Sequence, residues 1–127
     1  MRILLPMTES QLQALCFQSH WNRYPEERGL LYMNYNNPKN AIQGAHLRAL
    51  GMIKGVADMT YLSKSGAVFL EFKTEVGKQS PAQVEWQAKV LTAGYAYRII
   101  RNETDFWNAI KEYYIPCNNT KKELYKD

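Results

Sequence analysis

Asp58, Glu71 and Lys73 are the residues of this sequence whose types and spacing could perform chemistry together. They belong to a predicted β-hairpin, in which two runs rich in aromatic and branched residues, 59–62 and 67–73, are separated by a turn that contains glycine. Because side chains alternate along a strand, Glu71 and Lys73 share one face of the second strand. Two carboxylates and an amine on one patch could bind a metal ion and activate water.

The register of this hairpin determines whether the two carboxylates meet. If the loop consists of residues 63–66, Leu62 pairs with Ala67. Counting back along both strands then places Asp58 opposite Glu71, with Cβ atoms roughly 4.5–5.5 Å apart. Like charges directly opposite each other destabilise a sheet, so a divalent cation between them is the most economical explanation. The alternative is a surface hairpin with a solvated Glu–Lys pair, because the tripeptide E-x-K is frequent by chance.

A longer pattern around these residues resembles a known nuclease family. It consists of GMIKGVAD at residues 51–58, EFK at 71–73 and SPAQ at 80–83. Together these segments resemble the virus-type replication-repair nuclease (VRR-NUC) domain of the PD-(D/E)xK nuclease superfamily. That family often has proline directly before the aspartate, where this sequence has Ala57, and no chemistry depends on that position. The resemblance extends over residues 9–114.

The resemblance implies an α/β fold with a restriction-endonuclease-like core, in which a small mixed β-sheet is flanked by helices. It implies a single VRR-NUC-like nuclease domain over residues 1–115, followed by a polar C-terminal tail over residues 116–127. It also implies Mg²⁺ or Mn²⁺ as the cofactor, held by Asp58 and Glu71, with the lysine of the EFK motif acting on the attacking water. The backbone carbonyl of Phe72, between the two catalytic side chains, is expected to complete the metal shell.

Glu9 is a further candidate that a structural role explains equally well. It follows Thr8, which forms a predicted capping box with Gln11, and a carboxylate in the first turn is favoured by the helix dipole. Family members carry a glutamate in their N-terminal helix next to the metal site. The resemblance therefore assigns Glu9 to support of the metal.

Gln83 also has two explanations. Ser80 and Gln83 form a second predicted capping box, with Pro81 at the favoured first position of the helix. Family members place this glutamine near the catalytic strand, so the resemblance adds Gln83 to the catalytic residues. Trp86, further along the same helix, is expected to pack in the core.

The other elements follow from apolar periodicity and from start and stop residues. They are a first helix that stops before Pro25, a strand at 30–35, a helix at 39–50, a strand at 95–101 and a helix opened by Asn102. The order helix, strand, helix, hairpin, helix, strand, helix indicates an α/β domain with a small mixed sheet.

Basic residues on both sides of the hairpin could contact the phosphates of a nucleic acid. Lys39, Arg48 and Lys54 precede the aspartate, and Lys78 lies in the polar loop that follows the hairpin. The alternative is that these side chains are solvated on ordinary surface segments, and the sequence does not separate the two interpretations.

The composition fits one globular domain. The chain has 127 residues, a net charge of +4 and 46% hydrophobic residues, which permits a phosphate-bearing partner without requiring one. Cys16 and Cys117 lack CxxC spacing, and two histidines are too few for a zinc site. The N-terminal apolar run is too short for a signal peptide, and no stretch approaches a membrane span. We therefore expect a cytoplasmic protein.

The sequence thus predicts a metal-dependent DNA endonuclease. No base-reading motif is visible, so recognition of the shape of duplex or branched DNA is expected rather than of its sequence. Stand-alone members of the resembled family suggest a homodimer that acts on branched DNA such as Holliday junctions, and a monomer that only nicks fits the sequence equally well. The resemblance, together with the small size, implies a phage or prophage origin. The alternatives are a catalytically silent nucleic-acid-binding module with the same fold, and an unrelated α/β protein.

Overall fold

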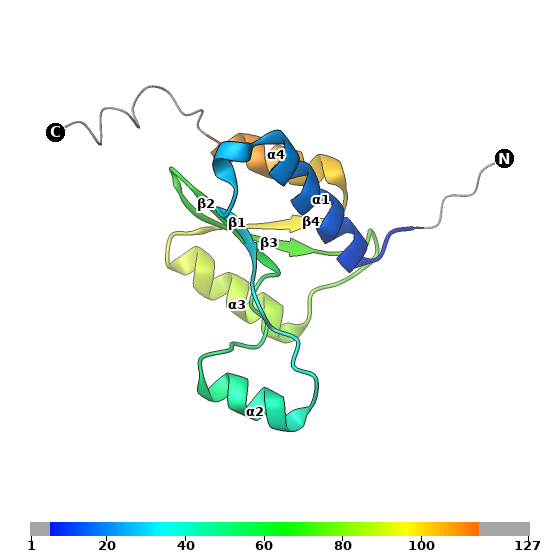
Figure 1. Cartoon of the computed structure of the whole chain (residues 1–127). Helices are drawn as coiled ribbons and strands as arrows, with labels where there is room; N and C mark the ends of the chain where they lie inside the picture. The colour runs from blue at the N-terminus through cyan, green and yellow to red at the C-terminus, as the bar shows by residue number, and fades with distance from the viewer. Residues whose placement is uncertain (1–5, 115–127) are drawn as a thin grey trace.

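Helices cover both faces of a four-stranded β-sheet in this computed structural model, which describes residues 6–114 (Figure 1). The strands are β1 (Leu31–Met33), β2 (Met59–Ser63), β3 (Gly66–Phe72) and β4 (Ala96–Ile100). The helices are α1 (Glu9–Arg23), α2 (Ala41–Ala49), α3 (Pro81–Thr92) and α4 (Glu103–Tyr113), with a short 3₁₀ helix, η1 (Pro25–Glu27). The predicted α/β class and element order are confirmed.

The sheet is mixed, with strand order β1-β2-β3-β4. Strands β1, β2 and β3 are successively antiparallel, whereas β3 and β4 are parallel. The predicted hairpin register is confirmed, because Leu62 pairs with Ala67 and Met59 pairs with Leu70. Asp58 directly precedes β2, and its Oδ2 accepts a hydrogen bond from the backbone N–H of Phe72, next to Glu71 at the end of β3.

The two faces of β3 pack against different helices. Val68, Leu70 and Phe72 are buried in a core that includes residues of α1 and α4. On the opposite face Phe69 packs edge-on against Trp86 of α3, with ring centroids 4.9 Å apart. The alternation of side chains along a strand thus separates the larger apolar core from the face that carries Glu71.

The helix starts follow the local signals in the sequence. The Thr8 and Ser80 hydroxyls accept hydrogen bonds from the third helical residue of α1 and α3, and both reciprocal capping boxes form. Asn102 caps α4 in the same way through Asp105. These bonds satisfy N–H groups that have no partner inside the helix, which is why each helix begins where predicted.

The predicted strand at 30–35 and the predicted helix at 39–50 are both longer than the observed β1 and α2. Strand β1 ends at Met33, although the backbone N–H of Asn34 still donates to the carbonyl oxygen of Asp58 at 2.8 Å. The predicted tail, residues 116–127, lies outside the described residues. Within the described residues no helix is long and apolar enough to cross a membrane.

Helix α2 lies on an excursion, residues 38–55, that stands apart from the sheet in Figure 1. The excursion returns to the body at Gly55, which has φ +87°. A Cβ at Gly55 would lie only 2.4 Å from the carbonyl oxygen of Ala82 at the start of α3. Only glycine therefore permits this close approach of two backbones, which brings the segment before Asp58 against α3.

Candidate metal and active site

Asp58 is fixed between the excursion and the sheet. The segment before it is anchored by Asn34 and Asn36, whose side-chain amides donate to the carbonyl oxygens of Ala57 and Val56. The Oδ2 of Asp58 accepts a hydrogen bond of 2.7 Å from the backbone N–H of Phe72. The carboxylate is therefore held against the end of β3, at the level of Glu71.

The environment of Asp58 raises the pKa of its carboxyl group. Burial is the largest cause, and the negative charges of Glu71 and Glu9 act in the same direction. The Phe72 N–H and the Lys73 ammonium act in the opposite direction and do not fully compensate. A nearby cation would therefore stabilise the ionised form of this carboxylate.

Glu71 is fully buried and only half of its carboxylate is paired. Its Oε1 accepts a hydrogen bond from the Tyr97 hydroxyl. Its Oε2 is buried and has no hydrogen-bond partner among the described residues. A buried carboxylate oxygen without a partner costs about 1–3 kcal/mol or more. The donor set and this unpaired oxygen fit a hard divalent cation, which prefers oxygen ligands.

Lys73 is buried beside the two acids, and Gln83 holds its amine. The Lys73 Nζ donates to the Gln83 Oε1 at 2.9 Å and lies 3.9 Å from the Oε1 of Glu9. The same Gln83 oxygen also accepts from the backbone N–H of Ser80 at 2.8 Å. Gln83 thus caps α3 and positions the lysine at once, so the structural and the functional explanations from the sequence coexist.

Glu9 and Phe72 reach the site in different ways. Glu9 is half exposed and lies nearest to Lys73. Phe72 buries its side chain on the opposite face, while its backbone N–H binds Asp58. No group of three or more His, Cys, Asp or Glu side chains within residues 6–114 is arranged to hold a metal ion. The carboxylate pair matches Mg²⁺, which uses one or two carboxylates with water and phosphate oxygens.

Tyr97 is the residue near the acids that sequence reasoning missed. It is buried on the face of β4 that also carries Ile99, and Ile99 is the parallel partner of Glu71. Burial raises the pKa of Tyr97, and the hydrogen bond to Glu71 raises it further, so the hydroxyl stays protonated and donates. The alternation within 95–101 puts Tyr97 on one face with Ile99, but the register with β3 is not visible in the sequence.

Arg101 fixes the loop of residues 74–77 that borders the site, a role that no pattern in the sequence indicates. Its Nη1 donates to the carbonyl oxygens of Thr74 at 2.7 Å, Gly77 at 2.8 Å and Glu75 at 3.3 Å. A Cβ at Gly77 would lie 2.9 Å from the Thr74 side chain, so the loop is compact. The guanidinium therefore fixes the backbone between β3 and α3.

The four predicted phosphate-binding cations are all exposed but lie on two separate segments. Lys39, Arg48 and Lys54 belong to the excursion around α2, whereas Lys78 lies on the loop that Arg101 fixes. Their role in binding nucleic acid stays a prediction.

The fold and this acid–acid–lysine arrangement define a class, an α/β domain with a mixed sheet that carries two acids and a lysine at one end of its central strands. No family model and no curated protein matches the chain. Among solved structures, one described as "VRR_NUC domain protein" is similar, with a TM-score of 0.70 and 17% sequence identity. The match covers 87% of this chain and 90% of that chain. The chain thus has a VRR-NUC fold, which confirms the predicted resemblance at the level of fold.

Proposed function

We propose that this protein is a metal-dependent nuclease that hydrolyses phosphodiester bonds in DNA. The observation that supports this most strongly is the buried Glu71 carboxylate, whose Oε2 has no partner among the described residues and whose charge acts on the nearby Asp58. The VRR-NUC fold supports the same proposal. An acidic pair with no cation would be a costly structural feature without a purpose.

In this proposal Asp58 and Glu71 hold Mg²⁺ or Mn²⁺, the Phe72 carbonyl contributes a further oxygen, and Glu9 supports the site from α1. A bound divalent ion lowers the pKa of water and neutralises charge on the phosphate oxygens. Tyr97 occupies the Oε1 of Glu71, so the unpartnered Oε2 would be the oxygen available to a cation.

Lys73 supplies the second part of the chemistry. Its amine is held by Gln83 and is desolvated by burial, so it has little conformational entropy to lose when substrate arrives. At this position it would orient the attacking water or donate to the phosphate oxygen on which charge develops. Gln83 would act as a positioning residue through the lysine.

The substrate class in this proposal is duplex or branched DNA, such as a Holliday junction, in the cytoplasm. The proposal places one active site, at Asp58 and Glu71, on each chain, whereas cutting both strands of a junction needs two. A homodimer would supply them. Light scattering at working concentrations tests this part, and a clean monomer mass would contradict paired cutting.

Cleavage of labelled DNA tests the enzymatic proposal. Branched and duplex DNA would be incubated with Mn²⁺ and either the parent chain or the variants Asp58→Asn and Glu71→Gln. We expect cleavage by the parent, none in the presence of a chelator, and none by either variant although both still bind DNA. Equal binding with no cleavage by the parent would identify a silent binding module instead. Equal cleavage by parent and variants would indicate a contaminating nuclease.

A further inference from the structure

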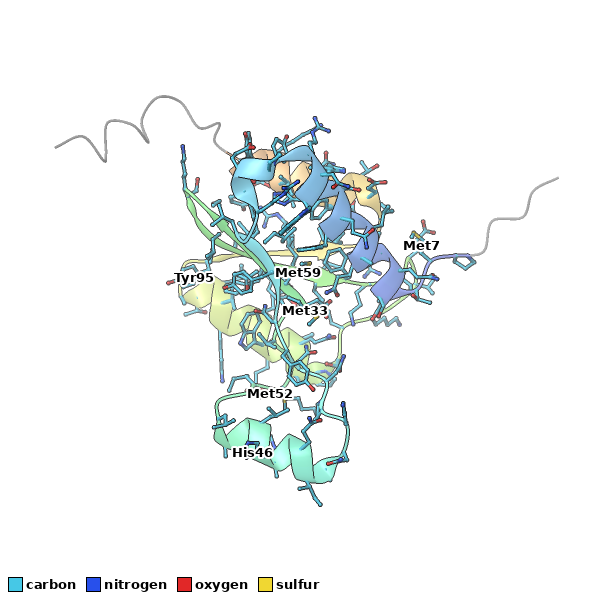
Figure 2. The ribbon with its side chains drawn as sticks, viewed as in Figure 1. Met7, Met33, His46, Met52, Met59 and Tyr95 are labelled. Atoms are coloured by element: carbon cyan, nitrogen blue, oxygen red, sulfur yellow. The ribbon has the colours of Figure 1, made fainter. Side chains whose placement is uncertain are left out.

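A groove of about 640 Å³ leads from the protein surface to Asp58. One wall is helix α1, which contributes Phe17 and Trp21, one helical turn apart. The other wall is β1 with residues 34–37, and it includes Met33. Met33 pairs with Met59 of β2, and both are labelled near the middle of the sheet in Figure 2. The groove and the candidate metal site share Asp58, so a ligand bound in the groove would lie next to the metal site.

The lining of this groove is suited to flat, neutral, hydrogen-bonding groups. Trp21 is 41% exposed and Met33 is 62% exposed, which leaves apolar surface available in the groove. Gln13, Gln18 and Asn37 also line it, and their side-chain amides make no hydrogen bond within residues 6–114. Aromatic surface beside unengaged amides is the combination that binds nucleobases by stacking and by edge contacts.

The charges of the groove argue against a phosphate backbone lying along it. Among the described residues that line it, Asp58 is the only charged side chain. Phosphates would meet a carboxylate there and no cation. The nearest cation given for a lining residue is Arg28, whose guanidinium lies over the Trp21 ring, 4.9 Å from the ring centre. Its Nε donates to the Trp21 carbonyl oxygen, which fixes the guanidinium over that ring.

We propose that this groove binds the unpaired bases of a single-stranded segment next to the phosphodiester that is cleaved. Paired bases cannot occupy it, because their faces are stacked and their pairing edges are engaged. The position of the cleaved bond rests on the proposed nuclease function. The binding of unpaired bases in the groove does not depend on that function. Within the proposed class of duplex or branched DNA, this binding favours branched DNA that carries a single-stranded segment, such as a flap, at the cleavage site over a fully paired duplex or Holliday junction.

Equilibrium binding without metal tests the groove separately from catalysis. The probes are a labelled blunt duplex and the same duplex with an unpaired oligothymidylate flap, measured by fluorescence anisotropy in the presence of a chelator. We expect the parent to bind the flapped duplex more tightly than the blunt one. Trp21→Ala should weaken flap binding by about 5- to 150-fold, the range for losing one stacked base, and leave blunt-duplex binding within about twofold.

Three matched variants keep the result interpretable. Trp21→Phe retains an aromatic face and should retain most of the flap affinity. Tyr95→Ala removes an aromatic of similar exposure, 50%, that does not line the groove, and should change neither affinity. Figure 2 shows Tyr95 at the start of β4, on the side of the sheet away from the N-terminal end of α1. Thermal melting identifies any variant that fails to fold. If Trp21→Ala does not fold, Met33→Glu on the other wall of the groove is measured in its place, and it should also weaken flap binding.

The outcomes separate this inference from the proposed function. Equal affinity of the parent for blunt and flapped duplex, or equal loss of both in Trp21→Ala, would overturn the groove proposal even if the parent cleaves DNA. Selective loss of flap binding would support it even if no cleavage is detected. A dimer in light scattering that Met33→Glu dissociates, with no flap preference, would identify the groove as a self-association surface and overturn the proposal.

Discussion

Binding of Mn²⁺ should raise the melting temperature of the parent chain strongly. The unpaired Oε2 of Glu71 and the raised pKa of Asp58 both mean that the folded protein without metal holds negative charge in a poorly compensated place. A cation that binds only the folded state at a concentration 100 times its Kd adds about 2.7 kcal/mol of stability. For a domain of this size that corresponds to a rise of roughly 10 °C.

Variants decide whether the acids are responsible. We expect Asp58→Asn and Glu71→Gln to lose most of the shift caused by Mn²⁺, because each removes one anionic ligand. Glu75→Gln removes an exposed acid on the neighbouring loop and should leave the shift unchanged. Differential scanning fluorimetry across a titration of Mn²⁺, reversed by a chelator, measures all four proteins. The reasoning is refuted if the parent shows no shift at millimolar metal, or if the variants shift as much as the parent.

The pH dependence of the protein without metal follows from the direction of the Asp58 shift. Burial raises the pKa of Asp58 above its value near 3.8, so the folded state binds this proton more tightly than the unfolded state. The free energy of unfolding should therefore fall as pH rises from 3.8 through the folded-state pKa, and the loss is complete above that pKa. Asp58→Asn removes this loss and should be more stable than the parent at neutral pH in a chelator, as measured by urea denaturation. A less stable variant would contradict the assigned cause.

Three other substitutions test how the site is positioned. Gly55→Ala combines a positive φ with a Cβ 2.4 Å from the Ala82 carbonyl oxygen, so it should lower the free energy of unfolding by about 3–5 kcal/mol in urea denaturation. Gly51→Ala, where the space is open, should lower it by only about 1–2 kcal/mol. Equal losses in the two variants would contradict the close approach. Tyr97→Phe removes the donor to Glu71 and should weaken Mn²⁺ binding by about 10- to 100-fold in a calorimetric titration, and unchanged affinity would exclude an orienting role. Gln83→Ala should lower the free energy of unfolding by about 1–2 kcal/mol through the lost cap, and it should also lower the cleavage rate. The control Gln87→Ala removes the hydrogen bond to Gln79 and should leave the cleavage rate unchanged. Equal cleavage rates for the two variants would contradict the role of Gln83.

The features that the sequence predicted well are those set by neighbours along the chain. The hairpin register follows from its own turn, so the pairing of Leu62 with Ala67 could be counted from the sequence. The caps at Thr8, Ser80 and Asn102 are contacts across three residues and are equally visible. Local geometry of this kind needs no knowledge of the rest of the fold.

The features that it missed depend on contacts between distant segments. Tyr97 reaches Glu71 only through the parallel register of β3 and β4, which a crossover helix separates in the chain. Arg101 binds carbonyl oxygens about 25 residues away, and backbone carbonyls carry no sequence signal. The groove beside Asp58 forms where α1 meets β1 and residues 34–37. Periodicity identifies each of these segments but does not bring them together.

A crystal of the parent chain soaked in Mn²⁺ and measured for anomalous scattering tests the central claim most directly. We predict one strong peak between Asp58 and Glu71, about 2.1 Å from the Oε2 of Glu71, that is absent from Asp58→Asn crystals treated in the same way. No peak at this position in the soaked parent crystal, or a peak that persists in the variant, would contradict the assignment of these two acids as the metal site.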